Sequence, residues 1–231
     1  IRVLREMIQK ERFDIVHCHG SRANMIGAIL KRTINIPIVT TVHSDYRLDY
    51  LGRPFHRLTY GTINTVALRL FDYHIGVSDA MVQLLISRGF DPQKLFSIYN
   101  GVEFPPKKTA LSREEYLSSI GVSFDEDTVV FGIAARLNPV KDIATLIRGF
   151  AKAAEKCPNI RLVIAGDGEE RKNLEALAKE LCPESSVTFA GWVRDTDSFY
   201  HAIDVNMLTS LSEGSPYALV EGARMRCATI A

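Results

Sequence analysis

The chain has 231 residues and carries 28 Lys and Arg residues against 27 Asp and Glu residues, a formal net charge of +1. This balance argues against a nucleic-acid partner, because binding to phosphate backbones needs a basic surface. Apolar residues make up 46% and charged residues 24%, typical of a globular protein, and no apolar run is as long as a membrane span. The four cysteines form no Cys-x-x-Cys pair, so a reducing cytoplasm is the simplest setting.

Both ends of the sequence fall inside predicted elements. Residue 1 lies in a helical pattern, with Val3, Leu4, Met7 and Ile8 on one face. Residues 227–231 open a strand and stop. We therefore expect this chain to be an internal piece of a longer protein.

Residues 1–100 alternate between strand and helix. The predicted strands are 14–19, 36–43, 72–78 and 95–100, and helices begin near Ser21, Arg57 and Ser78. Such alternation predicts parallel strands, with functional groups at their carboxyl ends. Those ends carry His19-Gly20-Ser21, His43-Ser44-Asp45, Ser78-Asp79 and Asn100-Gly101. The pattern predicts half of a doubly wound lobe that lacks its first strand.

A second alternation follows a Pro-containing segment, residues 101–111, which we predict to be a linker and hinge. Ser112 and Glu115 have capping-box spacing and predict a helix start. The next strands are predicted at 128–134, 161–165, 187–190 and 205–208, with helices from about Lys141, Glu169 and Thr196. The sequence thus predicts an α/β protein of two doubly wound lobes, residues 1–100 and 112–231, the second truncated at its end.

A strand-to-helix turn near the end of the chain predicts a phosphate site. Glu213, Gly214 and Ser215 form the turn, with Ser215 as the expected N-cap and Pro216 as the first helical residue. The free N–H groups and the dipole of a helix N-terminus favour an anion. Glu221 follows five residues after Pro216 and could accept hydrogen bonds from a ribose diol. The alternative is that Glu213 caps the helix and Glu221 is a solvated surface acid.

Two cations flank another predicted strand-to-helix turn. Arg136 and Lys141 are five residues apart, and Lys141 is expected at a helix N-terminus, where an anion would offset its unfavourable interaction with the helix dipole. The alternative is a solvated turn in which Asp142 neutralises Lys141.

Together these motifs resemble those of the retaining glycosyltransferases of the GT-B fold, family 4. Glu213 and Glu221, with seven residues between them, match the family's glutamate pair, and Arg136 and Lys141 match its arginine–lysine pair. The resemblance implies two Rossmann-like lobes that transfer a sugar from a nucleotide diphosphate sugar to an acceptor with retention of configuration. It implies no metal and no other cofactor. The first lobe would lie on the acceptor side, and the second would bind the nucleotide sugar.

The resemblance also assigns roles to individual residues. Glu213 and His43 would lie by the donor sugar, Arg136 and Lys141 would hold the diphosphate, and Glu221 would hold the ribose. The remaining donor-binding residues that it implies are Gly166, Val193, Gly214, Ser215, Pro216 and Tyr217. Trp192 precedes Val193 in a loop that resembles the family's base-contacting loop, but we expect its indole to lie in the core.

The acceptor side is less defined. Residues 46–57 contain both aromatic residues and arginines. This composition is consistent with an acceptor pocket or with a membrane contact near a lipid-linked acceptor. The alternative is a connecting loop with snorkelling arginines. We therefore expect a carbohydrate or lipid-linked acceptor and a role in cell-surface polysaccharide biosynthesis. We also expect a cytoplasmic location, including peripheral contact with the inner membrane face.

Other patterns lead to weaker hypotheses. His17 and His19 share a strand face, but no third metal ligand is evident, and Asp195-Thr-Asp197 is better explained as a helix cap than as a metal site. The rival functions are a nucleotide-binding module without catalysis and a GT-B nucleotide-sugar epimerase.

Overall fold

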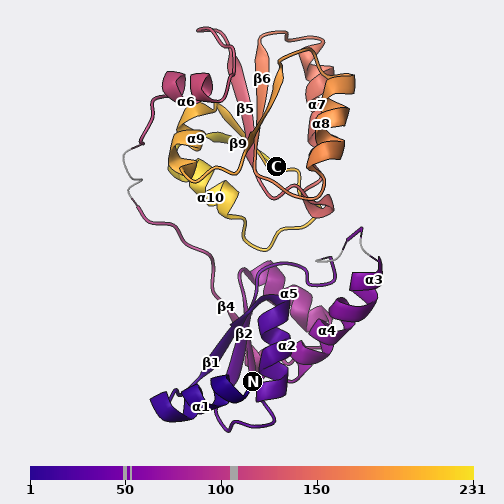
Figure 1. Ribbon diagram of the computed structural model, residues 1–231, viewed down its shortest axis with the longest axis vertical. Coiled ribbons are helices and arrows are strands. Elements are labelled where there is room, and N and C mark those ends of the chain that lie inside the picture. Colours follow the sequence, from indigo (N-terminus) through magenta and orange to yellow (C-terminus); the bar gives the residue numbers. More distant parts are fainter. Residues whose placement is uncertain (49–50, 53, 105–108) are drawn as a thin grey trace. The chain divides into compact units, whose positions relative to one another are not determined.

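The computed structural model describes residues 1–48, 51–52, 54–104 and 109–231 (Figure 1). It contains two compact units, each described below by itself. The first unit is Ile1–Asn100 with Ser212–Ser215, and the second is Gly101–Leu211 with Pro216–Ala231. The sequence placed residues 212–215 with the second lobe, whereas their contacts group them with the first unit.

The first unit contains a four-stranded parallel sheet. Its strands are β1 (Val16–His19), β2 (Ile38–Val42), β3 (Tyr73–Gly76) and β4 (Leu95–Ser97), in the order β1-β2-β3-β4. All five residues of β2 are buried, as expected for a central parallel strand that is covered on both faces. Parallel pairing sends the carboxyl ends of all four strands to one edge of the sheet.

The helices of the first unit follow the predicted alternation. They are α1 (Arg2–Glu11), α2 (Gly20–Leu30), α3 (Pro54–His56), the π-helix η1 (Arg57–Gly61), α4 (Thr62–Arg69), α5 (Asp79–Ser87) and the 3₁₀-helix η2 (Pro92–Lys94). The helix expected near Arg57 thus begins three residues earlier and includes a π-helical turn. Leu68, Leu85, Phe90 and other buried apolar side chains form a core between helices and sheet.

The second unit contains a five-stranded parallel sheet. Its strands are β5 (Val129–Ala134), β6 (Ile160–Ala165), β7 (Val187–Gly191), β8 (Val205–Met207) and β9 (Ala228–Ile230), in the order β7-β6-β5-β8-β9. The chain moves outward from β5 to β7 and then returns to the other side of β5. The strand order therefore reverses between β5 and β8, and such a switch point is where open α/β sheets bind ligands.

Helices cover both faces of this second sheet (Figure 1). They are α6 (Arg113–Ser119), the 3₁₀-helix η3 (Pro139–Lys141), α7 (Ile143–Ala154), α8 (Arg171–Leu181), α9 (Thr196–Ala202) and α10 (Tyr217–Arg224). Along β6, Leu162 and Ile164 pack into one core with α7 and α8, whereas Val163 and Ala165 pack into the other with α6 and α9. Successive side chains of a strand point to opposite faces of the sheet, so a continuously apolar strand can contribute to the core on each face.

Two predicted helix starts are wrong in detail. Ser215 is not the cap of α10, because Pro216 is extended (φ −71°, ψ 121°) and itself occupies the N-cap position. Lys141 is not at the start of α7 but ends η3. Asp142 then adopts a left-handed conformation (φ 43°), and its carboxylate caps α7 by accepting a hydrogen bond from Thr145 N. Asp142 is thus a helix cap, and not simply a counter-ion of Lys141.

Two expectations fall partly outside the described residues. The predicted hinge 101–111 includes residues 105–108, and the mixed aromatic and arginine segment 46–57 includes residues 49, 50 and 53, all outside the described ranges. Among the helices that are described, none is long and apolar enough to cross a membrane.

Candidate active site

The loops that follow β5 and β8 meet at the switch point of the second sheet. Leu211 N donates a hydrogen bond to the carbonyl of Val140 over 2.8 Å. Thr209 Oγ1 donates to the carbonyl of Lys141 over 3.0 Å. These two bonds fix the loop that carries Lys141 against the loop that leads toward α10.

The loop after β6 fixes the Arg136-containing loop from its other side. Gly166 has a φ of +133°, and a Cβ atom there would lie 1.9 Å from the carbonyl oxygen of Ala135. A Cβ atom on Gly168 would lie 2.2 Å from the carbonyl oxygen of Leu137. Only glycine permits both approaches. Gly166 was among the predicted site residues and Gly168 was not, although the Gly-x-Gly pattern after a strand was the available signal.

Arg136 is exposed at this edge of the sheet. Its Nη2 lies 3.6 Å from Glu169 Oε2, and its side chain is 66% exposed. Solvent screens such an ion pair, so it contributes little to stability. The Arg136 guanidinium is therefore accessible to an anion. The backbone of Lys141, by contrast, is fixed by the hydrogen bond that its carbonyl accepts from Thr209.

Two buried polar atoms on these loops have no hydrogen-bond partner within the described part of the chain. They are Asn138 Oδ1, in the loop after β5, and Ser210 Oγ, in the loop after β8. Buried polar groups are nearly always hydrogen-bonded. Two such atoms without a partner at the switch point therefore indicate a polar ligand or water there. Neither residue was among the predicted site residues.

Glu221 lies half-buried on α10. Burial raises the pKa of its carboxyl group, and Asp197 raises it further, whereas Arg224 and Tyr200 lower it. Arg224 and Asp197 form a buried ion pair between α10 and α9. Burial and the nearby Glu221 raise the pKa of Tyr200. Glu221 is therefore not a freely solvated surface acid, and its role toward a ribose stays a prediction.

The turn residues Glu213, Gly214 and Ser215 group with the first unit. Asn100 Nδ2 donates to the carbonyl of Ser215 over 2.7 Å. A Cβ atom on Gly214 would lie 2.3 Å from the carbonyl oxygen of His43, so glycine is required here for backbone packing. We expected its missing side chain to make room for a ligand instead.

His43 is exposed directly after β2. Its Nε2 lies 3.0 Å from His19 Nδ1, and the His17 ring stacks obliquely on the His19 ring with 4.2 Å between centroids. These imidazoles bond to each other and to Thr41 instead of converging on one point. Over the described ranges, no group of three His, Cys, Asp or Glu side chains is arranged to hold a metal ion.

The loop after β7 differs from its prediction in one respect. Trp192 is 77% exposed, so the expectation that its indole lies in the core is wrong. Val193 packs against the core formed with α9 instead. Asp195 caps α9 by accepting from Ser198 N over 3.1 Å, as expected. Any contact of this loop with a base would come from its backbone and from the exposed indole.

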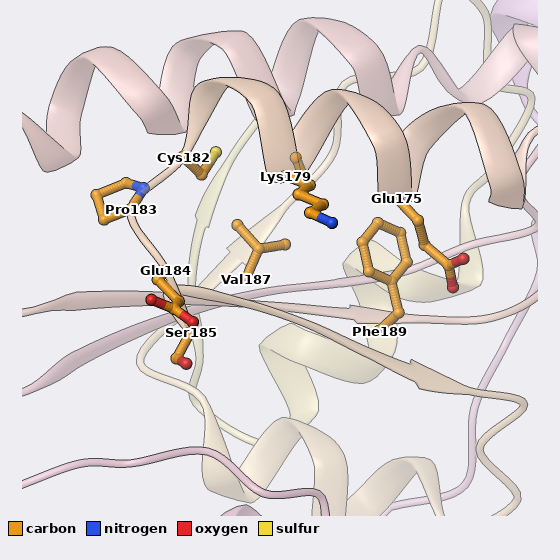
Figure 2. A pocket seen from close by; sticks show the side chains of 9 residues that line it. Glu175, Lys179, Cys182, Pro183, Glu184, Ser185, Val187 and Phe189 are labelled. Atoms are coloured by element: carbon orange, nitrogen blue, oxygen red, sulfur yellow. The ribbon is translucent and has the colours of Figure 1, made fainter.

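A separate pocket of about 450 Å³ lies between α8 and β7 (Figure 2). Its lining includes Glu175, Lys179, Cys182 and Phe189. Because β7 is the edge strand and is separated from β8 by both β6 and β5, this pocket is not at the switch point. The pocket therefore lies outside the candidate active site.

Comparison with known proteins identifies the family. The model of Glycosyltransferase Family 4 matches residues 1–104, and that of Glycosyl transferases group 1 matches residues 119–231. The structure of Anabaena HepE in complex with UDP-glucose superposes with a TM-score of 0.81 at 24% identity, covering 99% of this chain and 61% of that one. The chain belongs to the family 4 glycosyltransferases of the GT-B fold.

Curated relatives of this GT-B chain agree. An Escherichia coli UDP-Gal:alpha-D-GlcNAc-diphosphoundecaprenol alpha-1,3-galactosyltransferase is 28% identical over 94% of this chain. An uncharacterised glycosyltransferase from Methanocaldococcus jannaschii is 32% identical over 95% of it. The chain spans 57% of the length of each of these two relatives. The predicted fold class and family are thereby confirmed.

Proposed function

We propose that the full-length protein containing this GT-B chain transfers a sugar from a nucleoside diphosphate sugar to an acceptor with retention of configuration. The observation that carries the proposal is the switch point of the second unit, where the loops with Arg136 and Lys141 are fixed next to the loop that leads to α10. Family membership supports it.

The proposed roles follow from charge. Negative charge develops on the departing diphosphate, and preorganised cations and N–H groups stabilise such charge most effectively. Arg136, Lys141 and the first N–H groups of α10, from Tyr217 onward, would supply this stabilisation, so the proposed mechanism requires no metal. Glu221 would accept hydrogen bonds from the ribose hydroxyls. His43 and Glu213 would act on the sugar.

For the acceptor we propose a lipid-linked sugar at the cytoplasmic face of a membrane. The Escherichia coli relative uses a UDP-galactose donor and a diphosphoundecaprenol-linked acceptor. HepE was solved with UDP-glucose. UDP-sugars are therefore the first donors to test.

The test uses the full-length protein and a panel of UDP-, GDP- and ADP-sugars. A bound donor stabilises the native state, by about 2.7 kcal/mol at a hundred times its dissociation constant, so the melting temperature should rise with one nucleotide class. The selected donor is then incubated with and without a diphosphoundecaprenol-linked sugar, and the anomeric configuration of the product is read by NMR.

Transfer to the lipid-linked acceptor with retained configuration supports the proposal. Binding without any turnover would contradict it in favour of a nucleotide-binding module. Formation of an epimeric nucleotide sugar without an acceptor would contradict it in favour of an epimerase.

A further inference from the structure

The two histidines of β1 and the histidine after β2 are related by strand register. His17 pairs with Val39, and His19 pairs with Thr41, across parallel strands. Residues at alternate positions share a face, so His43, two residues beyond Thr41, lies on the same face as His19. His19 thus reaches His43 as a diagonal cross-strand neighbour, a distance that aromatic side chains can span.

The same diagonal relation produces two parallel hydrogen bonds. His17 Nε2 bonds to Thr41 Oγ1 over 2.8 Å, and His19 Nδ1 bonds to His43 Nε2 over 3.0 Å. The rings of His19 and His43 are stacked, with 5.3 Å between centroids and an interplanar angle of 29°. Both the position and the tilt of the His43 ring are therefore defined by His19.

A bond between two imidazole nitrogens holds one hydrogen. A neutral imidazole has one donor nitrogen and one acceptor nitrogen, whereas a protonated ring has two donors. If His19 and His43 were both protonated, two N–H groups would face each other across the 3.0 Å gap. The bond therefore requires that one of the two facing nitrogens carries no hydrogen, so the tautomer of His43 is coupled to that of His19.

We propose that His19 is a positioning residue, whose hydrogen bond fixes the orientation of the His43 ring, couples its tautomer to that of His19 and leaves Nδ1 of His43 to meet the donor sugar. This inference rests on the role proposed for His43. The partner of a histidine decides its tautomer, and the wrong tautomer is costly in catalysis.

The charges around His43 support the same arrangement. Although His43 is exposed overall, partial desolvation of its imidazole lowers its pKa, and the neighbouring His19 lowers this pKa further. Asp45, which follows two residues later, is engaged by Arg88 at 2.6 Å. Within the described ranges, His17 and Glu213 are further titratable groups near this point, the latter next to the Gly214 that packs on the His43 backbone. Removing the imidazole of His19 should therefore raise the pKa of His43.

The experiment compares His19→Ala and His19→Asn in the full-length protein. Asparagine places an amide near the position of the lost Nδ1 and can bond to His43, but it carries no charge. His17→Asn is the matched control, since it lies on the same strand and bonds to Thr41 instead. Two quantities are measured: the turnover number for transfer as a function of pH, and the titration of His43 by NMR of labelled histidine.

We expect turnover to fall about tenfold or more in His19→Ala, the usual cost of losing a residue that orients an imidazole, and to recover largely in His19→Asn. In both variants the His43 titration and the acidic limb of the rate profile should move to higher pH. The control should shift both much less, because the His17 imidazole bonds to Thr41 and not to His43. Recovery in His19→Asn separates positioning from a general loss of folding, which melting temperatures also report.

An unchanged His43 titration in His19→Ala overturns the proposal, whether or not the protein transfers sugar. So does equal loss of turnover in the alanine and asparagine variants with unchanged titration. Absence of transfer by the unmodified protein with every donor would instead refute the proposed function, and the titration would still decide the contact between His19 and His43.

Discussion

Replacing Lys141 by alanine in the full-length protein is expected to lower the turnover number for sugar transfer by about a hundredfold. The loss of one preorganised group that stabilises developing charge typically costs this much or more. The Michaelis constant for the donor should change much less, because the charge on the leaving diphosphate increases in the transition state. Steady-state kinetics with the donor selected by the binding panel measure both quantities.

Lys152 provides the matched control for this change. It is an exposed lysine in the last turn of α7, whereas Lys141 immediately precedes the cap of the same helix. Nine residues separate Lys152 from the first residue of α7, about 14 Å along the axis. Lys152→Ala should leave turnover unchanged. A Lys141→Ala variant with normal turnover and a raised Michaelis constant would show that Lys141 binds ground state and transition state equally.

Gly166→Ala is expected to destabilise the second unit by about 3 kcal/mol or more, since it combines backbone strain with a steric clash. The left-handed φ of +133° disfavours any Cβ atom, and this one would lie 1.9 Å from the Ala135 carbonyl. Relief requires movement of the loop that carries Arg136. Donor affinity should therefore fall as well. Urea denaturation and donor titration measure the two effects.

Gly149→Ala tests whether the effect is specific. Gly149 is an exposed residue within α7, and a Cβ atom there meets no atom within 4 Å. Alanine favours a helix interior by about 1 kcal/mol over glycine, so this variant should be slightly more stable. A loss below about 1 kcal/mol in Gly166→Ala would contradict the role assigned to the Gly166 turn.

Much of the fold was predictable because apolar runs define its buried strands. β5 and β6 lie within one residue of the predicted strands, since their residues must be apolar to fill two cores. The alternation of strands and helices also predicted the parallel sheets. The strand order, and with it the switch point between β5 and β8, follows from packing and is not legible in the sequence alone.

For the candidate site, the sequence indicates residue types that suit a donor site but not their local geometry. Asp142 in a left-handed conformation moves the start of α7, and the extended Pro216 moves the start of α10. Both helix starts depend on backbone dihedral angles, and several different sequences can adopt the same angles. Trp192 was misplaced because a large apolar ring favours the core unless its loop projects outward.

Contacts between segments far apart in the chain were beyond sequence reasoning. The bond between His19 and His43 depends on the register of β1 and β2, and a shift of one residue would send the two rings to opposite faces. The bond from Thr209 to the Lys141 carbonyl likewise requires the loops after β8 and β5 to be neighbours. Residue type alone marks neither contact.

Hydrogen–deuterium exchange of the full-length protein with and without its nucleoside diphosphate tests the central claim most directly. Binding at the switch point should slow exchange in peptides that cover residues 135–142, 166–170 and 208–217, because ligand contacts stabilise these loops. Peptides over residues 175–189, around the pocket in Figure 2, should be unaffected. Protection confined to residues 175–189, with the switch-point loops unchanged, would contradict the proposed donor site.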